Sequence, residues 1–92
     1  MKQEKNKLDM IHHLPRLKWA CRRGMLELDV LLGNFLENGY PDLSDDDKKL
    51  FITLLDCSDP EIFSWLMGKS QPDDPGLARI TEIMRDHAKS RI

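Results

Sequence analysis

The sequence has 92 residues, of which 40% are hydrophobic and 33% are charged, and its formal net charge at neutral pH is −2. This length closes one small core but not two, and the composition is that of a folded domain rather than a disordered segment. We therefore interpret residues 1–92 as a single domain. No apolar run approaches the length that a bilayer requires, so membrane insertion is not expected.

The chain opens with the polar segment MKQEKNKLDM, which has no apolar stretch of the kind found in a secretory signal. We interpret residues 1–11 as a flexible arm and about 13–90 as a helical bundle. The two cysteines, Cys21 and Cys57, lack the spacing of a metal site. We expect both to be reduced and to pack as small apolar side chains. A cytoplasmic location in a bacterium and a monomeric state are expected.

The first predicted helix spans about residues 13–22. Pro15 fits its opening turn, where the missing N–H has no partner to lose. The arginines at its end would complement the helix dipole, and Gly24 would follow as a left-handed residue.

Two further helices have clear apolar faces. The second predicted helix spans about residues 25–37 and carries an apolar stripe at spacings of three and four, made of Leu28, Leu31, Leu32, Phe35 and Leu36. Ser44 would open the third, with Asp47 three residues later in a variant of the capping box. Its buried face would consist of Leu50, Phe51, Leu54 and Leu55.

The last two helices begin with the same signal. Asp59 precedes Pro60, and Asp74 precedes Pro75, which places an N-cap before a proline in the first turn. Gly68 would end the fourth helix. Connections this short force neighbouring helices together, so the predicted fold is all-α, a compact bundle of about five short helices.

Catalytic signatures are missing from the sequence. There is no phosphate-binding glycine loop, no nucleophile elbow and no HExxH pair, and the histidines at positions 12, 13 and 87 lack the spacing of metal ligands. We predict no catalytic, metal-binding or cofactor-binding residue.

The octet RRGMLELD, residues 22–29, has two explanations. Helix capping accounts for basic residues at one helix end, a glycine, and acids at the next helix start. It does not require a second arginine, nor Met25 at a corner expected to be exposed. If exposed, Arg23, Met25 and Glu27 would combine a bidentate donor, an adaptable apolar side chain and an acceptor, a mixture that suits a docking surface.

The distribution of charge leaves other readings open. Residues 1–24 carry a net +5 and the remainder −7. A helical nucleic-acid-binding module could use the basic residues Lys2, Lys5, Lys7, Arg16, Lys18, Arg22 and Arg23. The acidic remainder would repel phosphate, so nucleic acid is not the expected partner. An adaptor for some other enzyme, using the same corner, is a further alternative.

The octet also carries a resemblance. Arg23-Gly24-Met25-Leu26-Glu27 resembles the RGxxE signature of the succinate dehydrogenase assembly factor family, known as SdhE in bacteria. The similarity covers roughly residues 14–85. It includes the segments Trp19-Ala20-Cys21-Arg22, Leu28-Asp29, Leu43-Ser44-Asp45-Asp46, Phe51, Leu54-Leu55, Asp59-Pro60 and Phe63-Ser64-Trp65-Leu66.

The resemblance implies a function and a set of site residues. Family members are small five-helix proteins that bind the flavoprotein subunit of succinate dehydrogenase, and often that of fumarate reductase. They promote covalent attachment of FAD to a histidine of that partner, so no stably bound cofactor is expected here. The implied contact residues are Arg23, Gly24 and Glu27, with a rim formed by Arg16, Trp19, Arg22, Met25 and Asp29.

Overall fold

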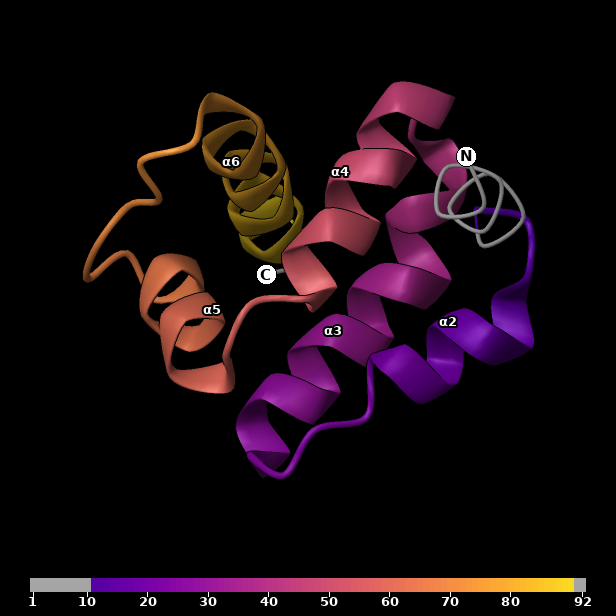
Figure 1. The fold of residues 1–92 in the computed structure, drawn as a ribbon, viewed down its shortest axis with the longest axis horizontal. Helices are drawn as coiled ribbons and strands as arrows, with labels where there is room; N and C mark the ends of the chain where they lie inside the picture. The colour runs from indigo at the N-terminus through magenta and orange to yellow at the C-terminus, as the bar shows by residue number, and fades with distance from the viewer. Residues whose placement is uncertain (1–10, 91–92) are drawn as a thin grey trace.

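The computed structural model describes residues 11–90, and within that range the chain is helical without strands. Its elements are α2 (Leu14–Ala20), α3 (Leu26–Asn38), the 3-10 turn η1 (Tyr40–Asp42), α4 (Asp45–Leu55), α5 (Asp59–Leu66) and α6 (Pro75–Ser90). Figure 1 shows α2 on one side of α3 and α5 on the other, while α4 packs against α6. The all-α prediction is confirmed.

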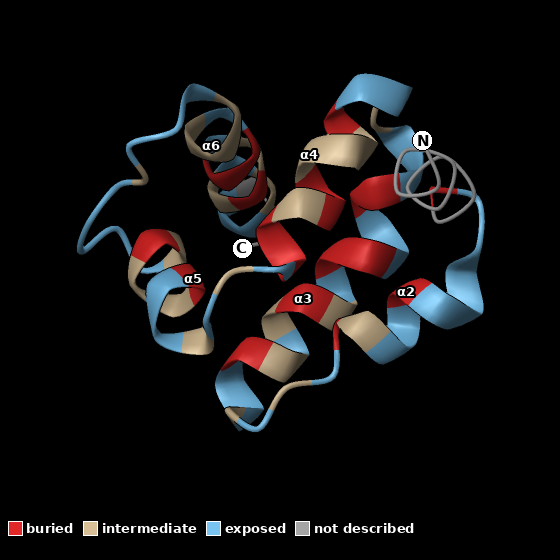
Figure 2. Ribbon diagram, viewed as in Figure 1, coloured by how far each residue is buried: buried red, intermediate tan, exposed pale blue. Residues whose placement is uncertain are grey.

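The core is formed by the inward faces of all five α-helices, and these faces appear as buried bands in Figure 2. The ring of Phe51 is fully buried, with its centroid 5.4 Å from that of Phe35 and 5.3 Å from that of Tyr40. Four members of the predicted α3 stripe are buried, and Leu31 is half-buried. The stripe is therefore the face that α3 turns toward the core.

The described chain begins with a buried residue. The carbonyl oxygen of Ile11 accepts a hydrogen bond of 2.9 Å from the hydroxyl of Tyr40, and the Ile11 side chain is 3% exposed. Ile11, which was assigned to the predicted flexible arm of residues 1–11, therefore belongs to the core. The rest of that prediction, residues 1–10, lies outside the described residues.

Side-chain caps fix the starts of the later helices. Ser44 accepts from the Asp47 N–H at 3.2 Å, and Asp74 accepts from the Leu77 N–H at 2.9 Å, as predicted. At α5 the N-cap is Ser58 rather than Asp59, because Ser58 and Glu61 form a reciprocal capping box. Asp59 becomes the first helical residue.

Gly68 ends the fourth helix, α5, as predicted, and it does so in a left-handed conformation. Gly68 follows α5 with a φ of +76°, and the N–H of Lys69 bonds back to the carbonyl oxygen of Ser64 at 2.9 Å. This pattern satisfies carbonyl groups at the end of α5 that would otherwise have no partner.

An ion pair joins α4 to α6. The Arg79 guanidinium donates to both carboxylate oxygens of Asp47, at 2.8 and 3.1 Å. Asp47 is buried and Arg79 is exposed. The hydrogen bond from Arg79 lowers the pKa of Asp47, against the opposing effect of burial. This carboxylate therefore holds α4 against α6 through Arg79.

Candidate partner-docking site

Arg23 lies in the connection between α2 and α3, but its guanidinium points into the molecule. Nη2 donates to the Leu55 carbonyl oxygen at 2.6 Å, and Nη1 donates to Asp59 at 3.2 Å. Its side chain is 14% exposed, and its buried Nε has no hydrogen-bond partner among residues 11–90. Arg23 was predicted as a contact residue. That role stays a prediction, and the two hydrogen bonds hold the end of α4 and the start of α5 against this connection.

Gly24 does not have the predicted conformation. Helix α2 ends at Ala20 rather than Arg22, Cys21 is its C-cap, and Gly68 is the described glycine with a positive φ. A Cβ added to Gly24 would meet nothing within 4 Å. Neither backbone conformation nor internal space therefore demands a glycine here.

Glu27 is exposed in the first turn of α3, where negative charge is favoured by the helix dipole. Its carboxylate has no hydrogen bond or ion pair within the described residues. Met25 is the N-cap of α3 and packs against the core while half-buried, so the expectation of an exposed Met25 was wrong. The Glu27 carboxylate can therefore accept a hydrogen bond from a partner, and Met25 beside it is half-buried.

The remaining rim residues lie on α2, in the connection and in the first turn of α3. Arg16 and Trp19 are exposed on α2, and the Trp19 side chain is 70% exposed. The Arg22 guanidinium lies 5.2 Å from the centroid of the Trp19 ring, in cation–π geometry. Asp29 is half-buried and accepts from the backbone N–H of Arg23 at 3.2 Å, which fixes the shape of the connection.

The predicted site residues therefore separate into two groups. We call the exposed or half-buried residues that do not bond to α4 or α5 the corner surface: Arg16, Trp19, Arg22, Gly24, Met25, Glu27 and Asp29. Arg23 is also half-buried, but its guanidinium bonds inward to the end of α4 and the start of α5. The corner was recognisable from the sequence, whereas the inward direction of Arg23 depends on partners more than thirty residues away.

Sequence reasoning missed an apolar groove next to the corner surface. It has a volume of about 410 Å³ and lies between α3 and α5, lined by Leu26, Glu27, Val30, Leu31, Phe63 and Met67. Leu26 and Val30 are spaced by one helical turn and fall outside the buried stripe of α3. These two apolar residues on the outer face of α3 were the signal in the sequence that could have indicated the groove.

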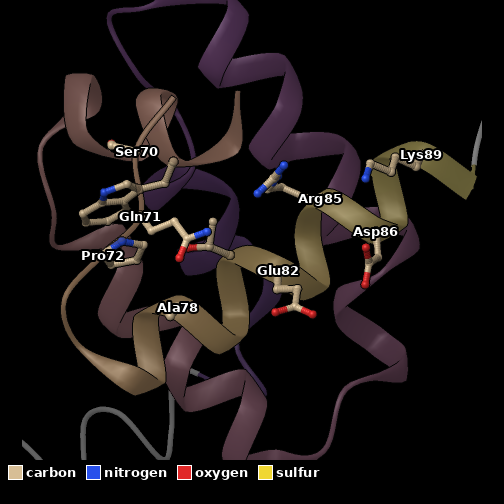
Figure 3. A pocket seen from close by; sticks show the side chains of 10 residues that line it. Ser70, Gln71, Pro72, Ala78, Glu82, Arg85, Asp86 and Lys89 are labelled. Carbon is tan, nitrogen blue, oxygen red and sulfur yellow. The ribbon is translucent and has the colours of Figure 1, made fainter. Parts of the chain in front are cut away.

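A separate recess of about 320 Å³ lies between the α5–α6 connection and α6. Figure 3 shows that its acids, Glu82 and Asp86, alternate on α6 with the bases Arg85 and Lys89. Because acids and bases are mixed, the recess has no excess of positive or negative charge, and no residue of the corner surface lines it. Within residues 11–90, no group of three potential metal ligands gathers, and no helix is long and apolar enough to cross a membrane.

The two cysteines are both free. Cys21 is buried directly after α2, and this burial raises the pKa of its thiol to about 11. The thiol is therefore protonated and unreactive near neutral pH. Cys57 is half-buried, and burial raises its pKa as well. Both side chains behave as small apolar groups.

Comparison with known proteins decides the family. The family model described as "Flavinator of succinate dehydrogenase" matches residues 15–88. The chain belongs to this family. A relative from Shewanella oneidensis named "FAD assembly factor SdhE" is 57% identical over 76 residues, which cover 83% of this chain and 93% of that protein. Relatives of the same name from a Serratia species and from Photorhabdus laumondii are 48% and 47% identical over 81 residues, covering 88% of this chain and 92% of each relative.

Membership in the flavinator family confirms the predicted function. The protein is an assembly factor that promotes flavinylation of the succinate dehydrogenase flavoprotein, and it is not an enzyme. The match includes the whole corner surface and both helices that line the groove. The relatives come from bacteria, as the sequence resemblance implied.

Proposed function

We propose that the corner surface docks this assembly factor onto the flavoprotein subunit of succinate dehydrogenase. The observation that carries the proposal is the exposed carboxylate of Glu27, which has no partner within the described residues although it lies in the family's RGxxE motif. Gly24 supports it, since the fold leaves open space where a side chain would be. A partner backbone that approaches Gly24 closely would explain a glycine at this position.

In this proposal Arg23 acts as a positioning residue. Its two hydrogen bonds hold the connection in the shape that presents Gly24 and Glu27 outward. Exposed Arg22 and Trp19 flank that connection and offer a planar cation and an aromatic face. Aromatic and arginine side chains are frequent energetic centres of protein interfaces.

The chemistry of FAD attachment belongs to the partner. The covalent bond forms between FAD and a histidine of the flavoprotein, and this chain contributes no catalytic group and holds no FAD stably. Docking would stabilise the conformation in which the reacting groups are aligned and the site is electrostatically prepared. A shift of about 3 kcal/mol in that population would change the rate by more than a hundredfold.

We assign this action to the bacterial cytoplasm, since both cysteines are free and oxidising compartments favour disulfides. The protein would act there as a monomer. The flavoprotein subunit of fumarate reductase is a second partner of the same class, implied by the resemblance of the motif. Nucleic acid is a poorer candidate because Arg23 is engaged internally and the adjoining groove is apolar with an acidic residue.

The test is in-gel flavin fluorescence of the denatured succinate dehydrogenase flavoprotein. Cells that lack this protein are compared with cells that receive the wild type or the variant Glu27→Ala. We expect fluorescence to be lost in the deletion, restored by the wild type and not restored by a folded Glu27→Ala protein. Equal fluorescence with the wild type and the variant would contradict docking through Glu27.

A further inference from the structure

The groove between α3 and α5 gathers most of the exposed apolar side chains. Five large hydrophobic residues are exposed within residues 11–90, and three of them line this groove: Leu26 at 73%, Val30 at 53% and Met67 at 46%. Half-buried Leu31 and Phe63 complete the apolar lining. Contiguous exposed apolar surface of this kind marks a binding site more often than a solvated face.

The groove contains one charged residue. Glu27 contributes to its lining, and its carboxylate has no ion pair among the residues that the structure describes. An apolar occupant alone would bury part of this carboxylate without compensation, which is unfavourable. An occupant that combines an apolar side chain with a nearby cation would satisfy both features of the groove.

The groove is continuous with the corner surface. Leu26 and Glu27 belong to the RGxxE pentapeptide itself, so a partner seated on the corner reaches the mouth of the groove. Leu31 and Met67 also line a second apolar recess of about 220 Å³ toward α6, which Met84 and Ala88 help to enclose. The apolar surface therefore extends beyond the space needed for one side chain.

We propose that this groove receives a segment of the flavoprotein subunit. That segment places an apolar side chain between Leu26 and Met67 and a lysine or arginine against Glu27. This inference rests on the proposed function and adds the chemistry of the partner's contact. Met67 is the decisive residue, because it is the C-cap of α5 and lies outside the motif that suggested the docking site.

The experiment measures equilibrium binding of the purified flavoprotein subunit to wild-type protein, Leu26→Ala and Met67→Ala. Leu14→Ala is the matched control, since Leu14 is 48% exposed, close to Met67, but lies on α2 outside the groove. Unfolding midpoints establish that the variants are folded. We expect Kd to rise about tenfold or more for each groove variant and to stay within about twofold for Leu14→Ala.

A second arm tests the cation. Binding of the wild type should weaken as salt rises, and Glu27→Gln should bind more weakly with a smaller dependence on salt.

The outcomes separate the two proposals. Wild-type affinity in Met67→Ala, together with weak binding of Glu27→Gln, would overturn the groove and leave the corner surface in place. Failure of the wild type to bind the flavoprotein would overturn both proposals. Dimerisation that Met67→Ala abolishes without weakening flavoprotein binding would assign the groove to a second copy and overturn this inference.

Discussion

The guanidinium of Arg23 donates a hydrogen bond of 2.6 Å to the carbonyl oxygen of Leu55, the last residue of α4. Carbonyl groups in the last turn of a helix have no partner within that helix, so Arg23 caps α4 from a distant part of the chain. It also pairs with Asp59 at the start of α5. The motif arginine is therefore part of the architecture that supports the corner surface.

Arg23→Ala should destabilise the fold, whereas the same substitution at Arg22 should not. Removal of the guanidinium leaves the Leu55 carbonyl and the Asp59 carboxylate without a donor, and we expect a cost of about 1 to 3 kcal/mol. Arg22→Ala, the control, should change stability by less than about 0.5 kcal/mol because Arg22 is exposed. Urea unfolding of both variants measures this difference. A fully stable Arg23→Ala protein that cannot promote flavinylation would instead make Arg23 a direct contact.

Gly24 and Gly68 should respond oppositely to alanine. Gly68→Ala would impose a side chain on a φ of +76°, and we expect a loss of about 1 to 2 kcal/mol. Gly24→Ala adds a Cβ with open space around it, so the unfolding free energy should be unchanged or slightly higher. Binding to the flavoprotein should nevertheless weaken in Gly24→Ala if the partner backbone approaches this position closely. Unfolding and binding curves for the same preparations provide the test, and a destabilised Gly24→Ala would refute an external role.

Phe51→Ala should be among the costliest substitutions in the chain. Its ring is fully buried against Phe35 and Tyr40, and we expect a loss of about 3 to 5 kcal/mol in unfolding free energy. Leu54, also fully buried, and Trp65, at 8% exposure, should cost about 2 to 5 kcal/mol when replaced by alanine. Denaturant unfolding checks these values, and a loss below about 1 kcal/mol for Phe51→Ala would contradict this description of the core.

The Asp47–Arg79 pair should give stability a dependence on acidic pH. Arg79 lowers the pKa of Asp47 in the folded state, so the pair contributes above the ordinary carboxyl pKa of about 4. That contribution is lost as pH falls through the lowered folded-state pKa. Arg79→Ala should therefore lower the unfolding temperature at pH 7, and the gap to the wild type should narrow below about pH 4. Lys89→Ala, an exposed change on α6, is the control. A gap that persists unchanged into strong acid would rule out this linkage.

Local signals in the sequence predicted the helices well, whereas distant contacts account for the errors at the candidate site. Ser44, Asp74-Pro75 and Gly68 were placed correctly because capping depends on residues three or four positions apart. The predicted N-cap of α5, Asp59, was wrong by one residue, because Ser58 forms a capping box with Glu61 and is the N-cap instead.

The candidate site was only partly predictable for the same reason. The motif identified the corner, but the inward direction of Arg23 depends on Leu55 and Asp59, which no local pattern connects to it. The groove also depends on tertiary structure, because Met67 meets Leu26 and Val30 only after α5 packs beside α3.

The most direct test of the docking claim is the rate of covalent flavin attachment to purified apo-flavoprotein supplied with FAD. The reaction is compared in the presence of wild-type protein, Glu27→Ala and Glu37→Ala, which removes another exposed acid from the same helix. Glu27→Ala should lose no more than about 1 kcal/mol of stability. We predict equal acceleration by the wild type and Glu37→Ala, and at least about a tenfold slower reaction with Glu27→Ala. Acceleration by Glu27→Ala equal to that of the wild type would contradict the account.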